Sequence, residues 1–286
     1  MLLQVVLGLV LCVVASLGAP AVIDLTHKVN ARTLFWPGQP PFNFSILHRG
    51  YKKEWDTWLE VNSFALAEHG GTHIDAPSHY IQGHWRTHEI PASHLVGPGV
   101  IVDVTRKVEA AGSDYEVTVD DMKEWEEMYG EIPDGAVVIM KTGWSRYYPD
   151  SYRVFNSRTP QDMYSFHYPG LHVDTARWLA EEKSVVAVGS DTPSPEPGIN
   201  AGKFPVHKIL LEKNIILLEY VANLDKMPPT GSTIFIGVIN LQDGSGGPAR
   251  IMGVLGGGSA GLARGASIIL CLLSVLLTLM FVGNWQ

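Results

Sequence analysis

Residues 69–79 read HGGTHIDAPSH, which brings three histidines and an aspartate together within eleven positions. The glycines at 70 and 71 disfavour a helix, so the stretch lacks the helical HxxxH arrangement of zinc proteases. In an extended segment, His73 and Asp75 lie two positions apart and face the same side. The glycines also let the backbone bend, and this bend brings His69 to the same point. We therefore expect a turn and a strand that gather these three side chains.

The donor atoms of this stretch suit a divalent metal. Two neutral imidazoles and one carboxylate fit Zn²⁺ or Mn²⁺, so His69, His73 and Asp75 are predicted ligands. Asp75 has a second oxygen that can bridge to another ion. Pro77 ends the strand and turns His79 toward the site, where this histidine is left over for proton transfer. The alternative is a loop of hydrogen-bonded histidines, but the coincidence of these features in one stretch favours the metal.

A second candidate pair, His207 and Glu219, lies toward the C-terminal end. His207 opens a predicted helix, and Glu219 sits in the otherwise apolar strand 215–221. A carboxylate in a buried strand is costly unless it is paired or metal-bound. Pairing with a neighbouring Lys or Arg is the alternative. Together with residues 69–79, this pair supplies enough nitrogen and oxygen donors for two divalent ions.

The rest of the chain predicts one α/β domain: a strand-rich mixed sheet with few helices. Residues 59–66 alternate as a half-buried strand should. Further short apolar segments predict strands at 100–104, 136–140, 185–188, 215–218, 233–239 and 249–255. Helices are expected at 118–129, which opens with a capping box, at 175–183 after Asp174, and at 206–213.

The loop from 143 to 170 is long and aromatic. It is expected either to form a lid over a site or simply to pack down onto the domain.

The ends of the chain resemble targeting signals. Residues 1–18 form an apolar run followed by small residues, which is typical of a signal peptide. Residues 256–286 form a small-residue spacer and a hydrophobic tail, which favours a GPI-anchor signal over a single-pass helix. The domain itself is expected to span 19–255, on the secretory pathway and then at the cell surface or outside the cell. A membrane is therefore an expected partner through the C-terminal anchor.

Composition narrows the function further. The two cysteines, Cys12 and Cys271, lie in the end segments, so a cysteine nucleophile and disulfides in the domain are excluded. Asn43-Phe44-Ser45 is a glycosylation sequon, consistent with secretion and a glycoprotein. The net charge is −8 and no basic stretch occurs, which argues against nucleic-acid binding. A serine hydrolase is also disfavoured, because residues 143–146 lack the closing glycine of a G-x-S-x-G elbow.

Residues 69–79 and several other segments of the chain resemble the cyclase family of metal-dependent hydrolases. This family includes bacterial-type kynurenine formamidase and isatin hydrolase. Residues 69–79 match every fixed position of the family signature HxGTHxDxPxH. The segments 22–27, 35–38, 189–194, 204–207 and 244–250 also follow the family order, as do Glu219 and residues 223–225. The resemblance covers about residues 22–255.

The resemblance implies a swivelling β/β/α fold, a homodimer or larger homo-oligomer, and one or two metal ions per subunit. It implies that His69, His73 and Asp75 hold one metal and that Asp75, His207 and Glu219 hold a second. His79 is then the catalytic acid–base. Phe35 and Trp36 would line the substrate pocket. The implied substrate is a small-molecule amide.

The first hypothesis for function is an arylformamidase that converts N-formyl-L-kynurenine to L-kynurenine and formate in tryptophan catabolism. The same site can act on isatin, another cyclic amide or a lactone. A hypothesis of another class is a catalytically inactive, metal-stabilised binding protein of the cell surface, against which the retained His79 argues. The family members of known chemistry are mostly cytosolic, so the expected export leaves the physiological substrate open.

Overall fold

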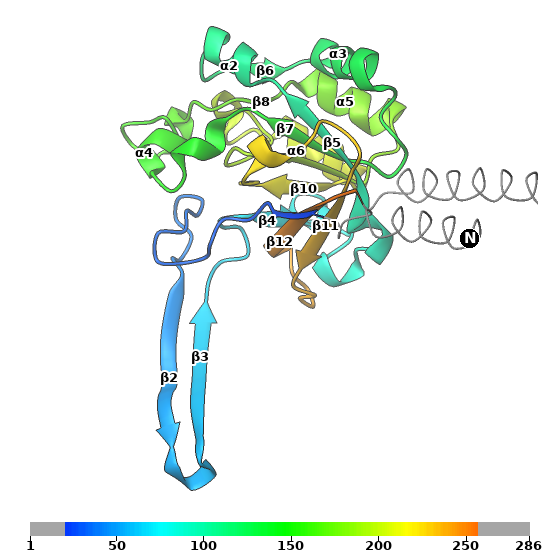
Figure 1. Ribbon diagram of the computed structural model, residues 1–286. Coiled ribbons are helices and arrows are strands. Elements are labelled where there is room, and N and C mark those ends of the chain that lie inside the picture. The colour runs from blue at the N-terminus through cyan, green and yellow to red at the C-terminus, as the bar shows by residue number, and fades with distance from the viewer. Residues whose placement is uncertain (1–20, 257–286) are drawn as a thin grey trace, which may run out of the picture.

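The computed structural model describes residues 21–256 of the 286. The expected signal peptide and the tail beyond residue 256 lie outside the described residues. Within them, eight strands form one mixed sheet in the order β1-β12-β11-β5-β7-β9-β10-β4. β12 also pairs with β4, so that the sheet closes on itself (Figure 1). The expectation of a single, strand-rich α/β domain is confirmed.

The strands of this sheet are three to ten residues long. They are β1 (Ala21–Asp24), β4 (His73–Asp75), β5 (Val96–Asp103), β7 (Val137–Lys141), β9 (Ala187–Ser190), β10 (Ile216–Glu219), β11 (Ser232–Val238) and β12 (Gly246–Leu255). β5, β7, β9 and β10 run parallel, and the remaining pairs are antiparallel. The parallel strands are buried on both faces, which explains their continuous apolar runs in the sequence.

Two apolar cores stabilise the domain. One core lies inside the closed sheet. It includes four completely buried side chains: Ile139, Leu218, Ile234 and Ile251. Outside it, the alternate side chains of the same strands pack beneath the helices. The helices are α2 (Thr105–Ala111), α3 (Val119–Tyr129), α4 (Ser151–Val154), α5 (Val173–Glu182) and α6 (Pro205–Glu212). In Figure 1, α2, α3 and α5 lie together above the strands β5 and β7.

Shorter elements connect these parts. β6 (Glu116–Val117) and β8 (Gly170–Leu171) form a two-stranded parallel sheet. Single 3-10 turns cover Lys53–Trp55, Pro77–His79, Thr87–Glu89, Ala92–His94, Trp144–Tyr147, Met163–Ser165, Gly198–Asn200 and Leu224–Lys226. No helix among the described residues has the length and apolarity needed to span a bilayer.

The capping box predicted at the start of α3 is present. The Thr118 hydroxyl accepts a hydrogen bond from the Asp121 N–H, and the Asp121 carboxylate accepts one from the Thr118 N–H. α5 begins earlier than expected. Its N-cap is His172 rather than Asp174, and Nδ1 of His172 accepts a hydrogen bond from the Asp174 N–H in the first turn. Sequence analysis did not predict α2 or the strand formed by residues 43–52.

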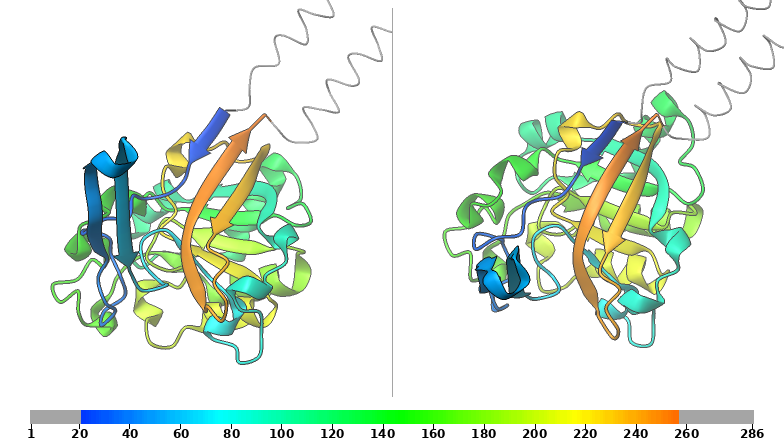
Figure 2. Two further views of the ribbon diagram at one scale, coloured as in Figure 1. Left: turned by 90° about the horizontal axis from the view of Figure 1, so that it is seen from below. Right: turned by 60° about the horizontal axis from the view of Figure 1, so that its bottom comes forward.

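The largest departure from expectation is a hairpin formed by β2 (Asn43–Lys52) and β3 (Thr57–Ala65). Residues 59–66 do form a strand, but the expected half-burial is wrong, since nearly all of β3 is exposed. The hairpin pairs with no other strand of the described chain. It extends far from the domain (Figures 1 and 2). We call residues 43–65 the arm.

The aromatic loop 143–170 packs down onto the domain. Trp144, Phe155 and Phe166 are buried, and the rings of Phe155 and Phe166 stack at 4.2 Å. Both of these rings meet Trp36 edge-on, at 6.4 and 5.4 Å between centroids. The loop therefore packs against Trp36. Its Tyr164, in contrast, remains 77% exposed.

The inner core gives a direct test of this fold. Ile139 is completely buried, so Ile139→Ala is expected to lower the free energy of unfolding by about 2–5 kcal/mol. Ile199 is 45% exposed, and Ile199→Ala should change it by no more than about 0.5 kcal/mol. Chemical denaturation of both variants measures the difference. Equal losses would contradict the placement of β7 at the centre of the sheet.

Candidate metal centre

The short strand β4 carries the centre. Its register with β10 sets Glu219 opposite His73 and Leu217 opposite Asp75. Ile74 between them points into the inner core. His73 and Asp75 therefore share the other face of the strand, as alternation requires. The Thr72 hydroxyl donates to the Tyr220 carbonyl at 2.7 Å and fixes β4 beside the end of β10.

The glycines before β4 are required by close contacts. Gly71 has φ +57°, in the left-handed region. A Cβ on Gly70 would lie 2.2 Å from the Phe35 ring. The backbones of Phe35 and Gly70 form an isolated antiparallel β-bridge. Phe35 thus supports the turn from behind and is absent from the residues that line the site cavity. Trp36, the other residue expected in the pocket, does line the cavity.

The spacing of donor atoms fits metal ions better than hydrogen bonds. His73 Nε2 lies 3.4 Å from Asp75 Oδ1 and 3.3 Å from Glu219 Oε2. His207 Nε2 lies 3.4 Å from Asp75 Oδ2 and 3.4 Å from Glu219 Oε1. Charge-assisted hydrogen bonds are shorter, at about 2.7–2.9 Å. Ligands bound to one tetrahedral ion at about 2.0–2.1 Å are separated by about 3.3–3.4 Å.

This donor set therefore offers two candidate metal positions. His73 with one oxygen from each carboxylate would hold one ion, and His207 with the remaining oxygens of Asp75 and Glu219 would hold the other. Asp75 and Glu219 thus face both positions. The expected second set of Asp75, His207 and Glu219 is brought together as one group. The residues present fit one or two divalent ions.

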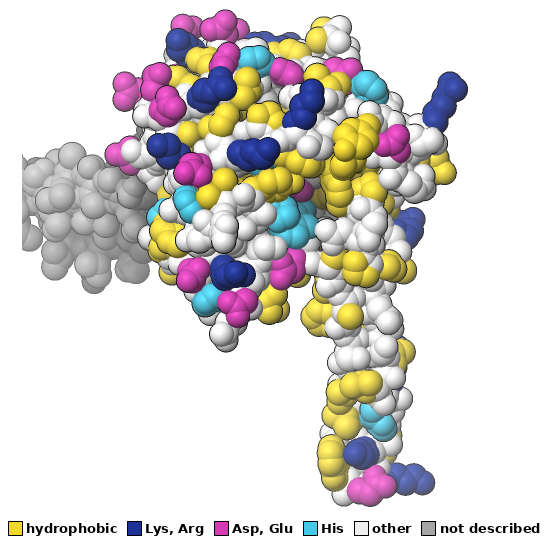
Figure 3. Space-filling view, turned by 180° about the vertical axis from the view of Figure 1, so that it is seen from behind, with side chains coloured by type: hydrophobic (Ala, Val, Ile, Leu, Met, Phe, Trp, Pro, Cys, Tyr) yellow, Lys and Arg dark blue, Asp and Glu magenta, His cyan; other side chains and the backbone are white. Residues whose placement is uncertain are grey.

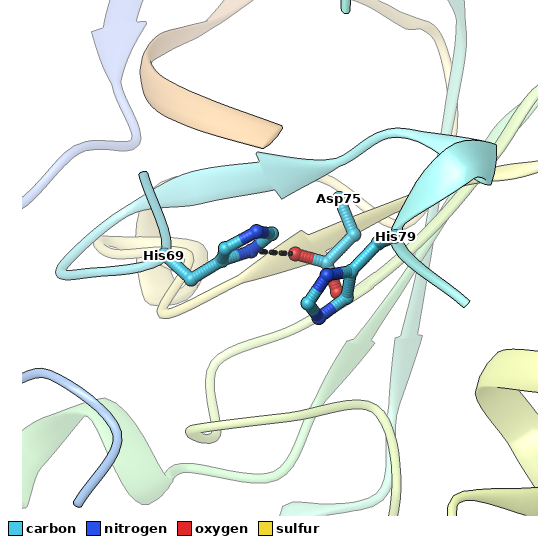
Figure 4. A group of neighbouring side chains, drawn as sticks. All are labelled: His69, Asp75 and His79. Atoms are coloured by element: carbon cyan, nitrogen blue, oxygen red, sulfur yellow. Dashed lines mark hydrogen bonds and ion pairs between the residues drawn. The ribbon is translucent and has the colours of Figure 1, made fainter. Parts of the chain in front are cut away.

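His69 and His79 lie on the outer side of this set. His69 Nδ1 is hydrogen-bonded to Asp75 Oδ1 at 2.6 Å (Figure 4). His69 Nε2 lies 3.0 Å from the Ser245 hydroxyl. The His79 ring stacks on His69 with centroids 3.9 Å apart. The ligand atoms of His69, Asp75 and His79 also converge enough to hold an ion. His79 is therefore placed either to ligate a metal or to move a proton beside it.

The charges of the site act differently on its histidines. Burial alone would lower the pKa of His73, but the carboxylates of Asp75 and Glu219 prevail and raise it to about 9. The same balance raises the pKa of His207 well above its usual range. Burial lowers the pKa of His79 to about 4, because the opposing charge of Asp75 is offset by the neighbouring imidazoles. The inner site thus attracts cations, whereas His79 is a neutral base at pH 7.

Sequence analysis missed Glu196, which orients His207. This completely buried carboxylate accepts hydrogen bonds from the N–H groups of Val206 and His207. Its Oε2 also lies 3.1 Å from His207 Nδ1, which leaves Nε2 directed at the metal positions. The Gly71 carbonyl accepts from His73 Nδ1 in the same way, at 2.8 Å. A lone acid between Pro195 and Pro197 was the signal available in the sequence.

The centre opens into a cavity of about 150 Å³. Its walls outside the donor residues are largely aromatic and carry no Lys or Arg: Trp36, Gln39, Tyr80, Pro193, Ser194, Phe204 and Tyr220. Phe204 has φ +51°, which is strained for a bulky side chain. Its ring meets Trp36, Tyr80 and His207 at 5.2–5.8 Å between centroids. An aromatic or planar group can therefore rest against these rings beside the metal positions.

Comparison with known proteins agrees with this geometry. Residues 23–197 match the family described as "Putative cyclase". The chain belongs to the cyclase family. It is 32% identical to an isatin hydrolase of Roseibium aggregatum over 83% of this chain and 93% of the relative. It is 26% identical to a kynurenine formamidase of Salinibacter ruber over 80% of this chain and 95% of the relative.

Solved structures give the same result. Isatin hydrolase A from Ralstonia solanacearum superposes with a TM-score of 0.75 at 29% identity, covering 86% of this chain and 95% of that one. An isatin hydrolase bound to the product analogue thioisatinate gives the same TM-score at 28% identity, covering 88% and 98%. With the donor set described above, this makes the protein a metal-dependent hydrolase of small-molecule amides.

The role of Glu196 can be tested by Glu196→Gln. We expect about 10- to 100-fold weaker metal binding, because the amide cannot accept from all three donors that now fix His207. Chelator competition measures this affinity. Glu212→Gln, an exposed change at the end of α6, the helix that carries His207, is the control and should bind metal normally. Unchanged affinity in Glu196→Gln would contradict the role assigned to Glu196.

Proposed function

We propose that the protein is an arylformamidase, which hydrolyses N-formyl-L-kynurenine to L-kynurenine and formate. The observation that carries the proposal is the pair of imidazole–carboxylate sets at 3.3–3.4 Å beside the neutral His79. Kynurenine formamidases are among the relatives over most of the chain. The aromatic walls suit the aryl ring, and Gln39 at the rim offers an amide to the amino-acid end of the substrate.

The side chains of the site can carry out each proton transfer of this reaction. His73, Asp75, His207 and Glu219 would hold a divalent ion, whose chemistry when bound would be to activate a water and polarise the amide carbonyl. His79, neutral at pH 7, takes a proton as the water attacks the formyl carbon and passes it to the leaving nitrogen. The carbon–nitrogen bond then breaks, and formate and the aryl amine are released. Zn²⁺ and Mn²⁺ both suit this donor set.

A second candidate, hydrolysis of isatin or another cyclic amide, is favoured by the shape of the cavity. A volume of about 150 Å³ suits a compact bicyclic ring. No Lys or Arg among the described residues lines the cavity to bind the carboxylate of an amino acid. An isatin hydrolase is also among the relatives. Attack on the ring carbonyl beside nitrogen would open the ring, with His79 moving the proton in the same way.

We also infer that the enzyme is exported, glycosylated, and held at the cell surface by a GPI anchor, as a homodimer or larger homo-oligomer. Residues 1–18 and 256–286, together with the Asn43 sequon, support this location. A phosphatidylinositol-specific phospholipase C applied to intact cells should release the protein. Protein that stays with the cells after this treatment would instead indicate a single-pass helix.

The role of His79 is tested by His79→Ala in the metal-loaded full-length protein. We expect kcat to fall about 100- to 10,000-fold while metal content is unchanged, because a base is lost and no ligand is. His88→Ala, at an exposed histidine outside the cavity, should keep full activity. Loss of metal from the His79 variant would make this residue a ligand instead of the base.

The substrates are compared in the same preparation, with N-formyl-L-kynurenine and isatin assayed side by side. Faster turnover of the formamide, lost in His79→Ala, supports the arylformamidase. Faster turnover of isatin supports the second candidate. Bound metal with no turnover of either compound would contradict both and favour a cell-surface binding protein.

A further inference from the structure

Tyr80 brings to the cavity a hydroxyl group that no described residue uses. The residue follows His79 directly and lines the cavity beside the donor residues. Its N–H donates to the Pro77 carbonyl and closes the turn Pro77–His79, so the backbone at this position is fixed. Its hydroxyl makes no hydrogen bond to another of residues 21–256. The wall of the cavity therefore holds a phenol whose donor is available to a substrate.

Three rings hold the side chain of Tyr80 in place. The His79 ring meets it edge-on, with 4.6 Å between centroids and an interplanar angle of 87°. The rings of Phe204 and His207 lie 5.2 and 5.0 Å away. Tyr80 thus lies between His79, the proposed base, and His207, a predicted metal ligand. A donor held in this way is preorganised and needs no rearrangement when the reaction begins.

The other neutral polar groups of the cavity are less suited to contact the reacting bond. Gln39 is exposed at the rim. The Ser194 hydroxyl already accepts a hydrogen bond from the Glu196 N–H at 3.0 Å. Tyr220 is only 4% exposed. Tyr80 is therefore the hydroxyl donor that adjoins the proposed base.

Charged donors do not compete for this role. Figure 3 shows Lys and Arg side chains on the outer surface of the domain, interspersed with Asp and Glu. None of the described Lys or Arg residues lines the cavity. Negative charge that develops on the substrate beyond the reach of a bound metal would therefore be stabilised by neutral hydrogen-bond donors.

Both candidate substrates offer an oxygen to this donor, and the inference rests on the proposed function. N-formyl-L-kynurenine carries a ketone on the ring carbon next to the one that bears nitrogen, and isatin carries its second carbonyl at the same place. Because the two groups are ortho on one ring, the side chain that contacts this oxygen must lie beside the side chain that reaches the nitrogen. His79 reaches the nitrogen, and the Tyr80 ring lies beside His79.

We propose that the Tyr80 hydroxyl donates a hydrogen bond to the carbonyl oxygen ortho to the scissile amide nitrogen. The substrates of the enzyme are then N-acyl aryl amines with an ortho carbonyl group, either open or closed into a ring. Tyr80 selects this class, while His79 acts on the amide that all such compounds share.

The hydrogen bond from Tyr80 strengthens as the bond to nitrogen breaks. Water adds its oxygen to the acyl carbon, and His79 takes one proton of the water. The carbon–nitrogen bond breaks with its electron pair on nitrogen, and His79 passes the proton to that nitrogen. The acid product keeps the second hydrogen of the water and ionises at pH 7. Before nitrogen is protonated, its charge is shared through the ring with the ortho carbonyl oxygen. Tyr80 donates to this oxygen and keeps its own proton, so the contact raises kcat.

The test uses pairs of substrates in which a methylene group replaces the ortho carbonyl. 2-Formamidoacetophenone is compared with N-(2-ethylphenyl)formamide, and isatin with indolin-2-one, in the metal-loaded full-length protein. Tyr80→Phe should lower kcat/KM about 10- to 100-fold for the two carbonyl compounds, and by no more than about threefold for their partners. Each effect compares two enzymes acting on one compound, so the intrinsic reactivity of the compound cancels.

Tyr148→Phe is the matched control. The Tyr148 ring packs against Tyr220 with 5.5 Å between centroids, but Tyr148 does not line the cavity. This variant also loses a phenol hydroxyl close to the site, and it should keep all four rates. Equal losses on both members of a pair in Tyr80→Phe would overturn the proposal, because a merely structural residue would slow both. Loss of bound metal from Tyr80→Phe would also overturn it.

An infrared measurement tests the same contact without turnover. 2-Aminoacetophenone with a ¹³C-labelled ketone is the amine released from the first substrate, and it is bound to the protein at saturating concentration. A hydrogen bond from Tyr80 should lower the ketone stretching frequency in the wild type relative to Tyr80→Phe. The same frequency in both proteins would overturn the proposal. If the wild type turns over none of the four compounds, the proposed function fails, and the infrared shift alone decides whether the Tyr80 contact exists.

Discussion

The double pairing of β4 is the constraint on which the rest of the molecule depends. This three-residue strand lies between β10 and β12, and its pairing with both closes the sheet. The same pairing places His73 opposite Glu219 and Asp75 opposite Gly246. A Cβ at Gly246 would lie 2.5 Å from the His69 ring, so the strand and the site fit only with glycine there. Closure of the sheet and assembly of the donor set therefore depend on the same pairing of β4.

Two buried carboxylates facing each other are costly, and the surroundings offset that cost with directed contacts. Burial and the charge of Asp75 raise the pKa of Glu219, while the imidazoles around Asp75 hold its own pKa well below the usual range. Glu196 is a third buried carboxyl group, and three N–H groups face it. Burying these ionic groups costs stability, and the same carboxylates attract cations to the site.

The two aromatic residues with positive φ lie near the same place. Phe204, Tyr220 and Asn223 all have φ between +51° and +55°, and the first two line the cavity. Such conformations persist only where the surrounding structure enforces them. Here the α6 start, the end of β10 and the Thr72 hydroxyl enforce them.

The sequence by itself determined the metal-binding stretch and most elements of the domain. Residues 69–79 carry their own geometry, since alternation and glycine bends are local properties of the chain. The apolar runs and the capping box at Thr118 likewise predict strands and α3 from local patterns. Only the tertiary structure decided what depends on contacts between distant residues. It placed Glu196 against His207, Phe35 behind Gly70, and both carboxylates across two metal positions. It also left β3 without a covering layer, which alternation along one strand cannot reveal, because burial depends on the neighbours that a strand meets in space.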